Sequence, residues 1–228
     1  MSNSIVEIED TKCIFIFGWN PADSHPIIAR RVVKAKEKGA TIIVCDPRKI
    51  ETARIADLHV PLKNGSNVAF VNALMHVIIH EGLADKEFIE KHTAGFEELK
   101  AIVDNYPPEA VTEITGIDAE TIRKTARMYA TAPDGAGIYW GMGVCQFYQG
   151  VETVRALTSM ALITGNLGKP HTGVAPVRGQ NNVQGACDMG ALPNVFVGYQ
   201  SVLDPAMREK FAKAWGVPVE RMSSKVGH

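Results

Sequence analysis

The sequence has no excess of charge of either sign. Its 228 residues include 24 lysines and arginines against 25 aspartates and glutamates, for a formal net charge of -1. A surface that binds nucleic acid or an anionic membrane usually carries a basic excess. We therefore predict no nucleic-acid partner, and any anionic ligand must be bound by groups gathered at one site.

Long hydrophobic runs are also lacking. Apolar stretches such as CIFIF at residues 13–17 are short and are separated by charged residues, whereas a membrane-spanning helix needs about 20 consecutive apolar residues. The first ten residues lack the basic segment followed by an apolar segment that is typical of a secretory signal. We therefore predict no membrane span and a cytoplasmic location.

Cysteine is scarce, and the cysteines are unpaired along the chain. Cys13, Cys45, Cys145 and Cys187 lie far apart, and none belongs to a Cys-x-x-Cys pair. This spacing argues against a zinc or iron–sulfur site built from neighbouring residues. Cys13 and Cys45 lie in apolar runs, so we interpret them as small buried core residues, and without a secretory signal we expect no disulfides.

What the sequence does contain is an alternation of apolar runs and amphipathic segments. Residues 13–17 and 41–45 have the pattern of strands buried on both faces, and residues 26–38 between them combine apolar and basic side chains as a helix does. The same criteria predict further strands at residues 58–62 and 136–140, and further helices at residues 68–80, 85–92, 95–105, 118–131, 151–164 and 204–215.

This order of elements predicts an α/β fold. Strands that alternate with helices form a doubly wound, Rossmann-like and mostly parallel sheet with helices on both faces. We expect this domain to span residues 1–178. Residues 179–228 are then expected to be the opening of a neighbouring second domain that is incomplete in this chain.

Polar residues follow the predicted strands in four loops, which contain Asp23, Asp46, Asn67 and Gln146. Because parallel strands end at one edge of the sheet, these loops are expected to meet there. Aspartate can accept hydrogen bonds from ribose hydroxyls or guanine N–H groups, and helix N-termini attract phosphate. The loop after the first strand reads GWNP and lacks Gly-x-Gly-x-x-Gly, which favours a nucleotide-like ligand other than ordinary NAD.

The segment RGQNNVQGACDMG, residues 178–190, is unusually rich in amides and glycine. Burying an amide without a partner costs roughly 2–7 kcal/mol, so such a segment is typical of a place where a polar ligand or a backbone network pairs with the amides. We interpret it as the floor of an active site. The alternative is an ordinary polar surface loop.

Four segments carry a resemblance to a known family: GWNPADSHP at 18–26, CDPR at 45–48, GMGVCQFYQG at 141–150 and the run at 178–190. Together they resemble the catalytic (alpha) subunit of molybdenum- or tungsten-dependent formate dehydrogenases, over nearly the whole chain. The first two segments also suit the wider molybdopterin oxidoreductase family. The resemblance implies a bis-(molybdopterin guanine dinucleotide) cofactor with molybdenum or tungsten, and the two-electron oxidation of formate to carbon dioxide.

The resemblance also implies roles for individual residues. Arg178 matches the arginine that positions formate, with Gln180 near the same cavity. A guanidinium can hold a carboxylate through two hydrogen bonds and stabilise the charge of the reacting group. The residues expected to line one guanine dinucleotide are Asp23, Cys45, Asp46, Arg48, Gly65, Asn67, Met142, Gly143 and Gln146.

Several features of that family's catalytic subunit are not found in the sequence. These are an N-terminal four-cysteine iron–sulfur motif, an electron-relaying lysine, a metal-binding cysteine or selenocysteine followed by histidine, and a C-terminal cap domain; no Cys-His dipeptide occurs. We therefore expect an internal part of a larger subunit that is inactive toward formate alone. The implied partners are the remaining domains of the same subunit and an iron–sulfur or electron-acceptor subunit, with a four-iron four-sulfur cluster whose ligands lie outside this chain.

Two other functions remain open at this point. The chain could belong to another molybdopterin oxidoreductase, of the nitrate or polysulfide reductase type. It could also be a stand-alone, non-catalytic α/β nucleotide-binding module, which is a function of another class.

Three histidines fall outside the predicted nucleotide site or at its border. His76 and His80 are four residues apart on a predicted helix, but a metal site usually needs three or more ligands, so we interpret the pair as structural. His171 lies in a glycine-rich loop, and we consider it a candidate to approach the pterin.

Overall fold

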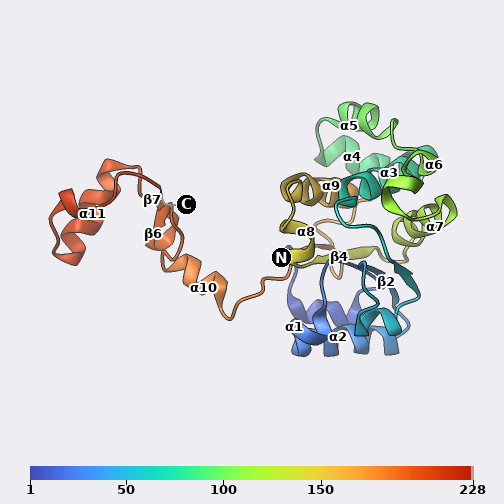
Figure 1. Ribbon diagram of the computed structural model, residues 1–228, viewed down its shortest axis with the longest axis horizontal. Coiled ribbons are helices and arrows are strands. Elements are labelled where there is room, and N and C mark those ends of the chain that lie inside the picture. The colour runs from blue at the N-terminus through green and yellow to red at the C-terminus, as the bar shows by residue number, and fades with distance from the viewer. Residues whose placement is uncertain (227–228) are drawn as a thin grey trace. The chain divides into compact units, whose positions relative to one another are not determined.

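The computed structural model describes residues 1–226 and divides the chain into two compact units, Met1–Val177 and Arg178–His228. The first unit contains a five-stranded sheet in the order β3-β2-β1-β4-β5. Every neighbouring pair in this sheet is parallel. This order and direction are those of a doubly wound fold, which confirms the predicted α/β class (Figure 1).

Strands β1 and β4 are buried along their whole length, β2 is buried except at Thr41, and β3 is only partly buried. Strand β1 spans Cys13–Phe17, β2 spans Thr41–Cys45, β4 spans Ala136–Trp140, and the shorter β3 spans Leu58–Val60. The sequence pattern predicted β1, β2 and β4 with these bounds. The fifth strand, β5 at Gly173–Pro176, was not predicted and pairs with β4 at the edge of the sheet.

Alternate side chains of β1 enter two different cores. Phe15 and Phe17 pack with helices α3 (Asn67–His80), α7 (Ala119–Ala130) and α9 (Gly150–Ile163). Ile14 and Ile16 pack against α2 (Pro26–Glu37) and the 3-10 helix η1 (Ile5–Asp10). Figure 1 shows α2 on one side of the sheet and α3, α7 and α9 on the other, so helices cover both faces as expected.

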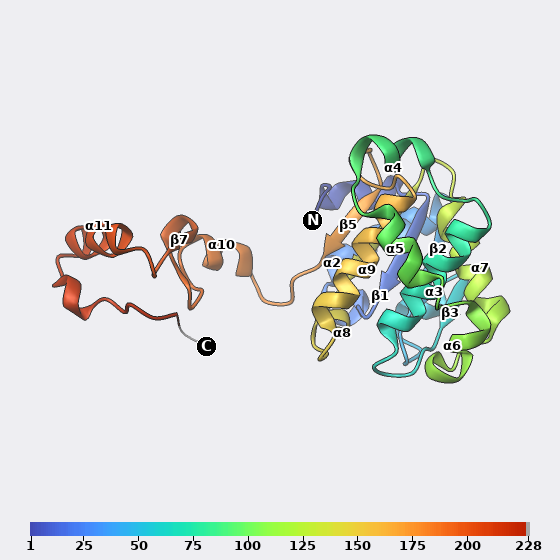
Figure 2. The same cartoon turned by 90° about the horizontal axis from the view of Figure 1, so that it is seen from above.

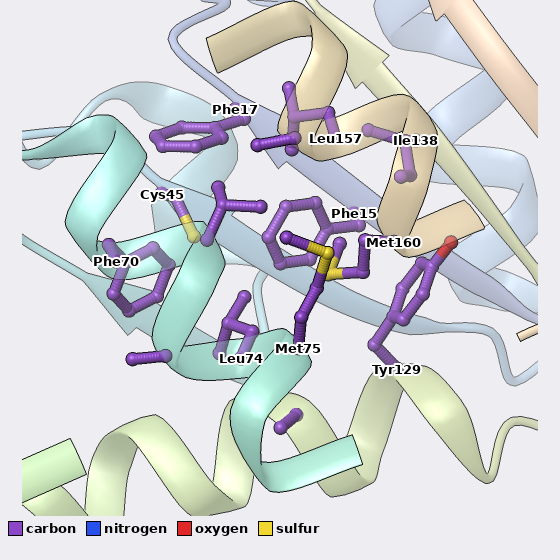
Figure 3. Packing of buried hydrophobic residues seen from close by; sticks show 14 of the residues in the cluster. Phe15, Phe17, Cys45, Phe70, Leu74, Met75, Tyr129, Ile138, Leu157 and Met160 are labelled. Carbon is purple, nitrogen blue, oxygen red and sulfur yellow. The ribbon is translucent and has the colours of Figure 1, made fainter. Parts of the chain in front are cut away.

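The core between β1 and α3 is aromatic and tightly packed (Figure 3). The rings of Phe17 and Phe70 meet edge to face at 6.2 Å between centroids, and those of Phe15 and Tyr129 do so at 5.6 Å. Edge-to-face contacts at such distances are favourable arrangements of aromatic rings. This packing fixes α3 against the sheet, and the first turn of α3 therefore has a defined position at the sheet edge.

A helical segment follows α3 and precedes α7. It contains α4 (Lys86–His92), α5 (Phe96–Val103) and α6 (Pro108–Thr115). The sequence pattern predicted α4, α5 and α7 but not α6. Pro108 occupies the first position of α6, where proline costs no hydrogen bond and its fixed φ suits a helix.

Three short elements connect the rest of the first unit. These are α1 (Pro21–Ser24) after β1, the 3-10 helix η2 (Glu51–Arg54) after β2, and α8 (Met142–Cys145) after β4. Across residues 1–226, the helices are too short or too polar to cross a lipid bilayer.

The second unit consists of short elements. They are α10 (Val183–Asp188), the hairpin of β6 (Val195–Phe196) and β7 (Gln200–Ser201) with η3 (Val197–Tyr199) between them, α11 (Pro205–Trp215) and η4 (Val219–Arg221). Helix α11 confirms the prediction at residues 204–215, with Asp204 accepting a hydrogen bond from the amide of Ala206 at 2.9 Å. The rings of Phe211 and Trp215 on α11 pack with the ring of Phe196 on β6.

Candidate functional site

The loops after β1 and β4 approach each other very closely at the carboxyl edge of the sheet. The amide of Gly143 donates a hydrogen bond to the carbonyl of Gly18 at 3.0 Å. A Cβ atom on Gly18 would lie 2.7 Å from the carbonyl carbon of Gly143, and one on Gly143 would lie 2.6 Å from the oxygen of Gly18. Gly18 also has a φ of 55°, so glycine is required here both for space and for backbone conformation.

This contact lies at the point where the strand order reverses. The chain leaves β1 toward β2 on one side, while β4 pairs with β1 on the other. In doubly wound sheets, such a switch point opens a crevice beyond the carboxyl ends of the strands, and ligands bind there. The fold therefore places the candidate site at Gly18 and Gly143.

A cavity of about 200 Å³ opens beside this contact. Its chemistry is mixed, with a carboxylate, two cationic side chains, amides and two aromatic rings. The lining residues are Phe17, Gly18, Cys45, Asp46, Pro47, Arg48, Leu62, Lys63, Asn64, Asn67, Gly143 and Phe147.

Asp46 is the carboxylate of this cavity and is held by its own loop. One carboxylate oxygen accepts a hydrogen bond from the amide of Arg48 at 2.8 Å, and the carbonyl of Asp46 accepts one from the ring of His59 at 2.9 Å. The Arg48 guanidinium lies 4.0 Å from the same carboxylate oxygen, but its side chain is 75% exposed against 10% for Asp46. The loop thus presents a fixed acceptor and, beside it, an extended cation.

A second cavity of about 120 Å³ is lined by residues that include Asn67 and Phe147, which also line the first. The two cavities therefore adjoin and form one groove. Gly65 and Val68 line it at the start of α3, and Gln149 lines it at the start of α9. The Ser66 hydroxyl donates to the carbonyl of Lys63 at 2.6 Å, so it does not cap the first turn of α3.

Two 14-residue helices thus begin at this groove. The first turn of a helix carries amide donors that the helix itself does not use, together with the positive end of the helix dipole. Both favour phosphate or another anion. The groove combines this positive edge with the Asp46 acceptor, which suits a ligand that has both phosphates and N–H or hydroxyl donors.

The predicted cofactor residues fall into two groups. Those that line the groove are Cys45, Asp46, Arg48, Gly65, Asn67 and Gly143. The other three residues do not line the two cavities. Asp23 is exposed on α1, and Met142 and Gln146 are exposed at the two ends of α8. The amide of Gln146 contacts the sulfur of Met142 at 3.5 Å, and Asp23 accepts a hydrogen bond from Asn20 at 2.6 Å.

Cys45 is a special case among these residues. Its thiol is fully buried with Phe17 and Val60 in the core under α3, as expected from the apolar run. Burial raises the pKa of the thiol well above its usual range, and the nearby Asp46 carboxylate raises it further. The thiol is therefore an inert core group, and only the main chain of Cys45 is available to a ligand.

Sequence reasoning missed several groove residues. Lys63 and Asn64 lie in a loop that was noted as polar, and Phe147 lies inside the segment at 141–150, but none of the three was assigned to the site. Phe147 is half-buried, and a single apolar residue in a loop is common on protein surfaces, so it gives no signal of a binding site in the sequence. Lys63 gives no signal either, because lysine is common on any surface.

Arg178 and Gln180 belong to the second unit, where both are exposed. The Arg178 guanidinium contacts the sulfur of the buried Cys187 at 3.5 Å. Part of the amide-rich segment is helical, because α10 spans Val183–Asp188 and follows Asn182, which has a φ of 48°. The segment is therefore an irregular stretch that carries Arg178, followed by a turn and a short helix.

His171, the candidate to approach the pterin, does not line the groove. His171 lies two residues before the start of β5, and its main-chain amide donates a hydrogen bond to a carboxylate oxygen of Glu7 at 2.9 Å. Gly173 at the start of β5 pairs with Gly137 near the start of β4, so His171 lies at the amino edge of the sheet. The groove lies at the opposite, carboxyl edge.

Comparison with known proteins adds a family assignment. A family model described as molybdopterin oxidoreductase matches residues 1–223. Formate dehydrogenase H of Escherichia coli is 68% identical over 217 residues, which cover 95% of this chain and 30% of that protein. The F420-dependent formate dehydrogenase 1 subunit alpha of Methanococcus maripaludis is 54% identical over 220 residues, covering 96% and 32%.

A solved structure is also similar. Acetylene hydratase from Pelobacter acetylenicus matches with a TM-score of 0.66 and 32% identity, covering 72% of this chain and 24% of that one. The chain spans about a third of the length of the formate dehydrogenases that it matches.

Proposed function

The chain belongs to the molybdopterin oxidoreductase family, and on that premise we propose that its groove binds one guanine dinucleotide arm of the cofactor of a formate dehydrogenase. Family membership implies a molybdopterin cofactor with molybdenum or tungsten. The likeness to formate dehydrogenases confirms the resemblance found in the sequence. The observation that carries the proposal is the groove at the switch point, where an acceptor, two cations and two helix N-termini meet.

The donors and acceptors of the groove fit such a ligand. Guanine presents N–H donors and ribose presents hydroxyls, both of which the fixed Asp46 carboxylate can accept. The first turns of α3 and α9, with Arg48 and Lys63, supply positive charge for a diphosphate. The Gly18–Gly143 contact removes side chains from the switch point, so a ligand can lie against the main chain.

The size of the groove indicates a partial site. Its larger cavity measures about 200 Å³, below the roughly 300–1,000 Å³ of typical small-molecule pockets. We propose that Asp46, Arg48, Gly65, Asn67 and Gly143 hold the nucleotide part, and that Asp23, Met142 and Gln146 contact it from the neighbouring loops. The rest of the ligand would then be held by other parts of the enzyme.

The catalytic proposal concerns Arg178 and Gln180. When bound, the cofactor supplies the two-electron redox centre at its metal. Arg178 would hold the formate carboxylate through two hydrogen bonds, which both orients it and balances its charge. Gln180 would add an amide donor to the same anion. Oxidation of formate to carbon dioxide by the whole enzyme is part of this proposal.

The finer features of the cofactor and the partners are proposals as well. We propose that the cofactor is the bis-(molybdopterin guanine dinucleotide) form. A four-iron four-sulfur cluster, held by ligands outside this chain, and an iron–sulfur or electron-acceptor subunit would carry the electrons away. The remaining domains of the same subunit would complete the site.

Calorimetric titration with GDP, the nucleotide half of the ligand, tests the groove. We expect the 228-residue chain to bind GDP, and Asp46→Ala to weaken binding about tenfold or more, because a charged hydrogen bond contributes roughly 1.5–3 kcal/mol. The matched control is Asp10→Ala, which removes an exposed carboxylate from η1, before the start of β1. Equal GDP affinity in the Asp46 variant and the wild type would contradict the proposal.

Formate kinetics of the whole enzyme test Arg178. Arg178→Ala is expected to lower kcat/KM for formate by about 100-fold or more, as does loss of a group that stabilises reacting charge, while the metal and pterin contents stay constant. Arg221→Ala, an exposed arginine in η4 of the same unit, serves as the control. Unchanged formate kinetics in the Arg178 variant would rule out its assigned role.

A further inference from the structure

Two histidines on α3 meet an aspartate that follows α5. His76 and His80 are four residues apart, and their rings stack at 4.2 Å between centroids. Asp104 contributes a carboxylate oxygen 2.7 Å from Nε2 of His80. One potential ligand atom from each of His76, His80 and Asp104 lies within 4.8 Å of the others. The sequence alone offered only the histidine pair, because the third group is 24 residues away.

The cluster is separate from the nucleotide groove. Helix α3 begins at the groove with Asn67 and ends at His80. With a rise of about 1.5 Å per residue, His76 and His80 lie roughly 14–20 Å along the helix from Asn67. The proposed function of the groove therefore gives this cluster no role.

Each histidine ring is held by a hydrogen bond to the end of α5, His76 to Val103 and His80 to Asp104. Nδ1 of His76 lies 2.9 Å from the carbonyl of Val103. A carbonyl only accepts, so Nδ1 carries the proton, and Nε2 keeps the lone pair that a metal ion binds. Val103 is fully buried in the core, so this carbonyl is a fixed anchor. Metal-binding histidines in proteins commonly donate their other N–H to such a carbonyl.

The surroundings favour a cation. His80 is the last residue of α3, where the negative end of the helix dipole lies. Asp104 adds a negative charge, and the side chains of His80 and Asp104 are 48% and 44% exposed, which leaves room for water ligands. Two imidazoles and one carboxylate match the ligand preferences of zinc and neighbouring transition metals, whereas magnesium and calcium prefer oxygen ligands.

We propose that His76, His80 and Asp104 form a binding site for a divalent transition-metal ion, with Zn²⁺ as the ion of choice. In this site, a metal replaces the proton between His80 and Asp104 and completes its coordination with His76 and water. The bound ion ties the C-terminal end of α3 to the end of α5. The site is structural, and it stabilises the helical segment that lies between α3 and α7.

The test is a zinc titration of the 228-residue chain made without a polyhistidine tag, in competition with a chromophoric chelator. We expect one zinc ion per chain, and a thermal unfolding midpoint that rises with zinc because the ion binds the folded state. His80→Ala and Asp104→Asn should each weaken zinc binding more than about tenfold, and zinc should no longer raise their unfolding midpoints.

His92→Ala is the matched control. His92 is an exposed histidine on α4 whose ring contacts Phe88 at 4.8 Å between centroids, and its loss should leave zinc affinity unchanged. Asp104→Asn keeps the size of the side chain, so a folding defect cannot account for its effect. Two outcomes overturn the proposal: no saturable zinc binding by the wild type, which leaves a surface ion pair only, or equal zinc affinity in the wild type, His80→Ala and Asp104→Asn. No readout depends on GDP or formate, so this test and that of the proposed function fail independently.

Discussion

The two edges of the five-stranded sheet use their polar groups in different ways. At the amino edge, Asn3 donates one hydrogen bond to Glu7 and another to the carbonyl of Lys169, both at 3.0 Å, and Glu7 also accepts from the amide of His171. The amide of Ser2 donates to the carbonyl of Val174 in β5, and Figure 2 shows the N-terminus beside that strand. These groups pair with one another across the edge, although ring Nδ1 of His171 has no hydrogen-bond partner among the described residues.

At the carboxyl edge, the polar groups are directed into a groove instead. Arg48 extends into solvent beside Asp46, and the first turns of α3 and α9 begin at the cavities. The comparison shows how polar groups that stabilise a parallel sheet can be distinguished from polar groups that bind a ligand. A closed network stabilises the fold, whereas fixed groups that face a cavity are available to a ligand.

The largest expected effect is on the backbone contact of the carboxyl edge. Gly18→Ala places a Cβ against the main chain of Gly143 at a φ of 55°. We expect a loss of about 3 kcal/mol in the free energy of unfolding, from left-handed strain of roughly 1–2 kcal/mol and the clash. Urea unfolding at neutral pH measures it.

Gly39→Ala is the control for the conformational part of that loss. Gly39 has a φ of 89°, but its Cβ would meet no described atom within 4 Å. Its alanine variant should lose only about 1–2 kcal/mol. Equal losses at both positions would show that the close approach at the switch point contributes nothing beyond backbone strain.

A smaller effect is expected when one cation of the groove is removed. Arg48→Ala should weaken GDP binding about threefold to tenfold, because the side chain is 75% exposed and its interaction with phosphate is screened by water. The folded state should keep its stability, since Asp46 is held by the main chain of Arg48. Calorimetry at low and at high salt measures both the loss and its screening.

Arg30→Ala removes an exposed cation from α2 and should leave GDP binding unchanged. If the Arg48 and Arg30 variants bind GDP equally well, the carboxyl edge does not use Arg48 for the ligand. The contrast between a closed and an open edge would then rest on Asp46 and the helix N-termini alone.

The smallest effect belongs to the amino edge and depends on pH. The hydrogen bond from Asn3, with those from the amides of His171 and Ser4, lowers the pKa of Glu7 from 4.5 to about 2. Because the folded-state pKa is lowered, the stabilisation by Glu7 is fully present above pH 4.5 and is lost as the pH falls toward 2. Glu7→Gln should therefore destabilise the chain at pH 7 more than at pH 2.5.

Urea midpoints of the wild type and Glu7→Gln at both pH values give this difference, and the other carboxylates cancel in it. GDP affinity at pH 7 should be the same in both proteins, because Glu7 lies at the edge opposite the groove. A difference in stability that does not change with pH would contradict the ionised network.

The parts of the fold that were predicted are those that local pattern determines. The runs at β1, β2 and β4 are only five residues long, are rich in β-branched and aromatic residues and are bounded by polar turns, which favours buried strands of a parallel sheet. Strand β5, with the sequence GVAP, has glycine and proline at its ends. Its extended form comes from pairing with the exposed edge of β4, a contact that no local pattern contains.

The site shows the same division. The positions of Asp46 and Asn67 after strands predicted that they lie at one edge, and both line the groove. Phe147 and Lys63 enter the groove through the packing of α3 and α9 against the sheet, which brings residues more than 80 positions apart together. The third member of the histidine cluster, Asp104, was likewise missed because only the packing of α5 on α3 places it there.

The buried alternation along β1 has a consequence for how this domain can change in length. Phe15 and Phe17 enter one core while Ile14 and Ile16 enter the other, so deleting one residue within β1 would exchange its aromatic and aliphatic faces. The same deletion would draw Gly18 back from Gly143 by one residue step. Insertions and deletions should therefore accumulate in the loops between α3, α4 and α5, because length changes there leave the phase of the strands unaltered. A library of length variants would be depleted at residues 13–18 and populated at residues 81–84 and 93–95.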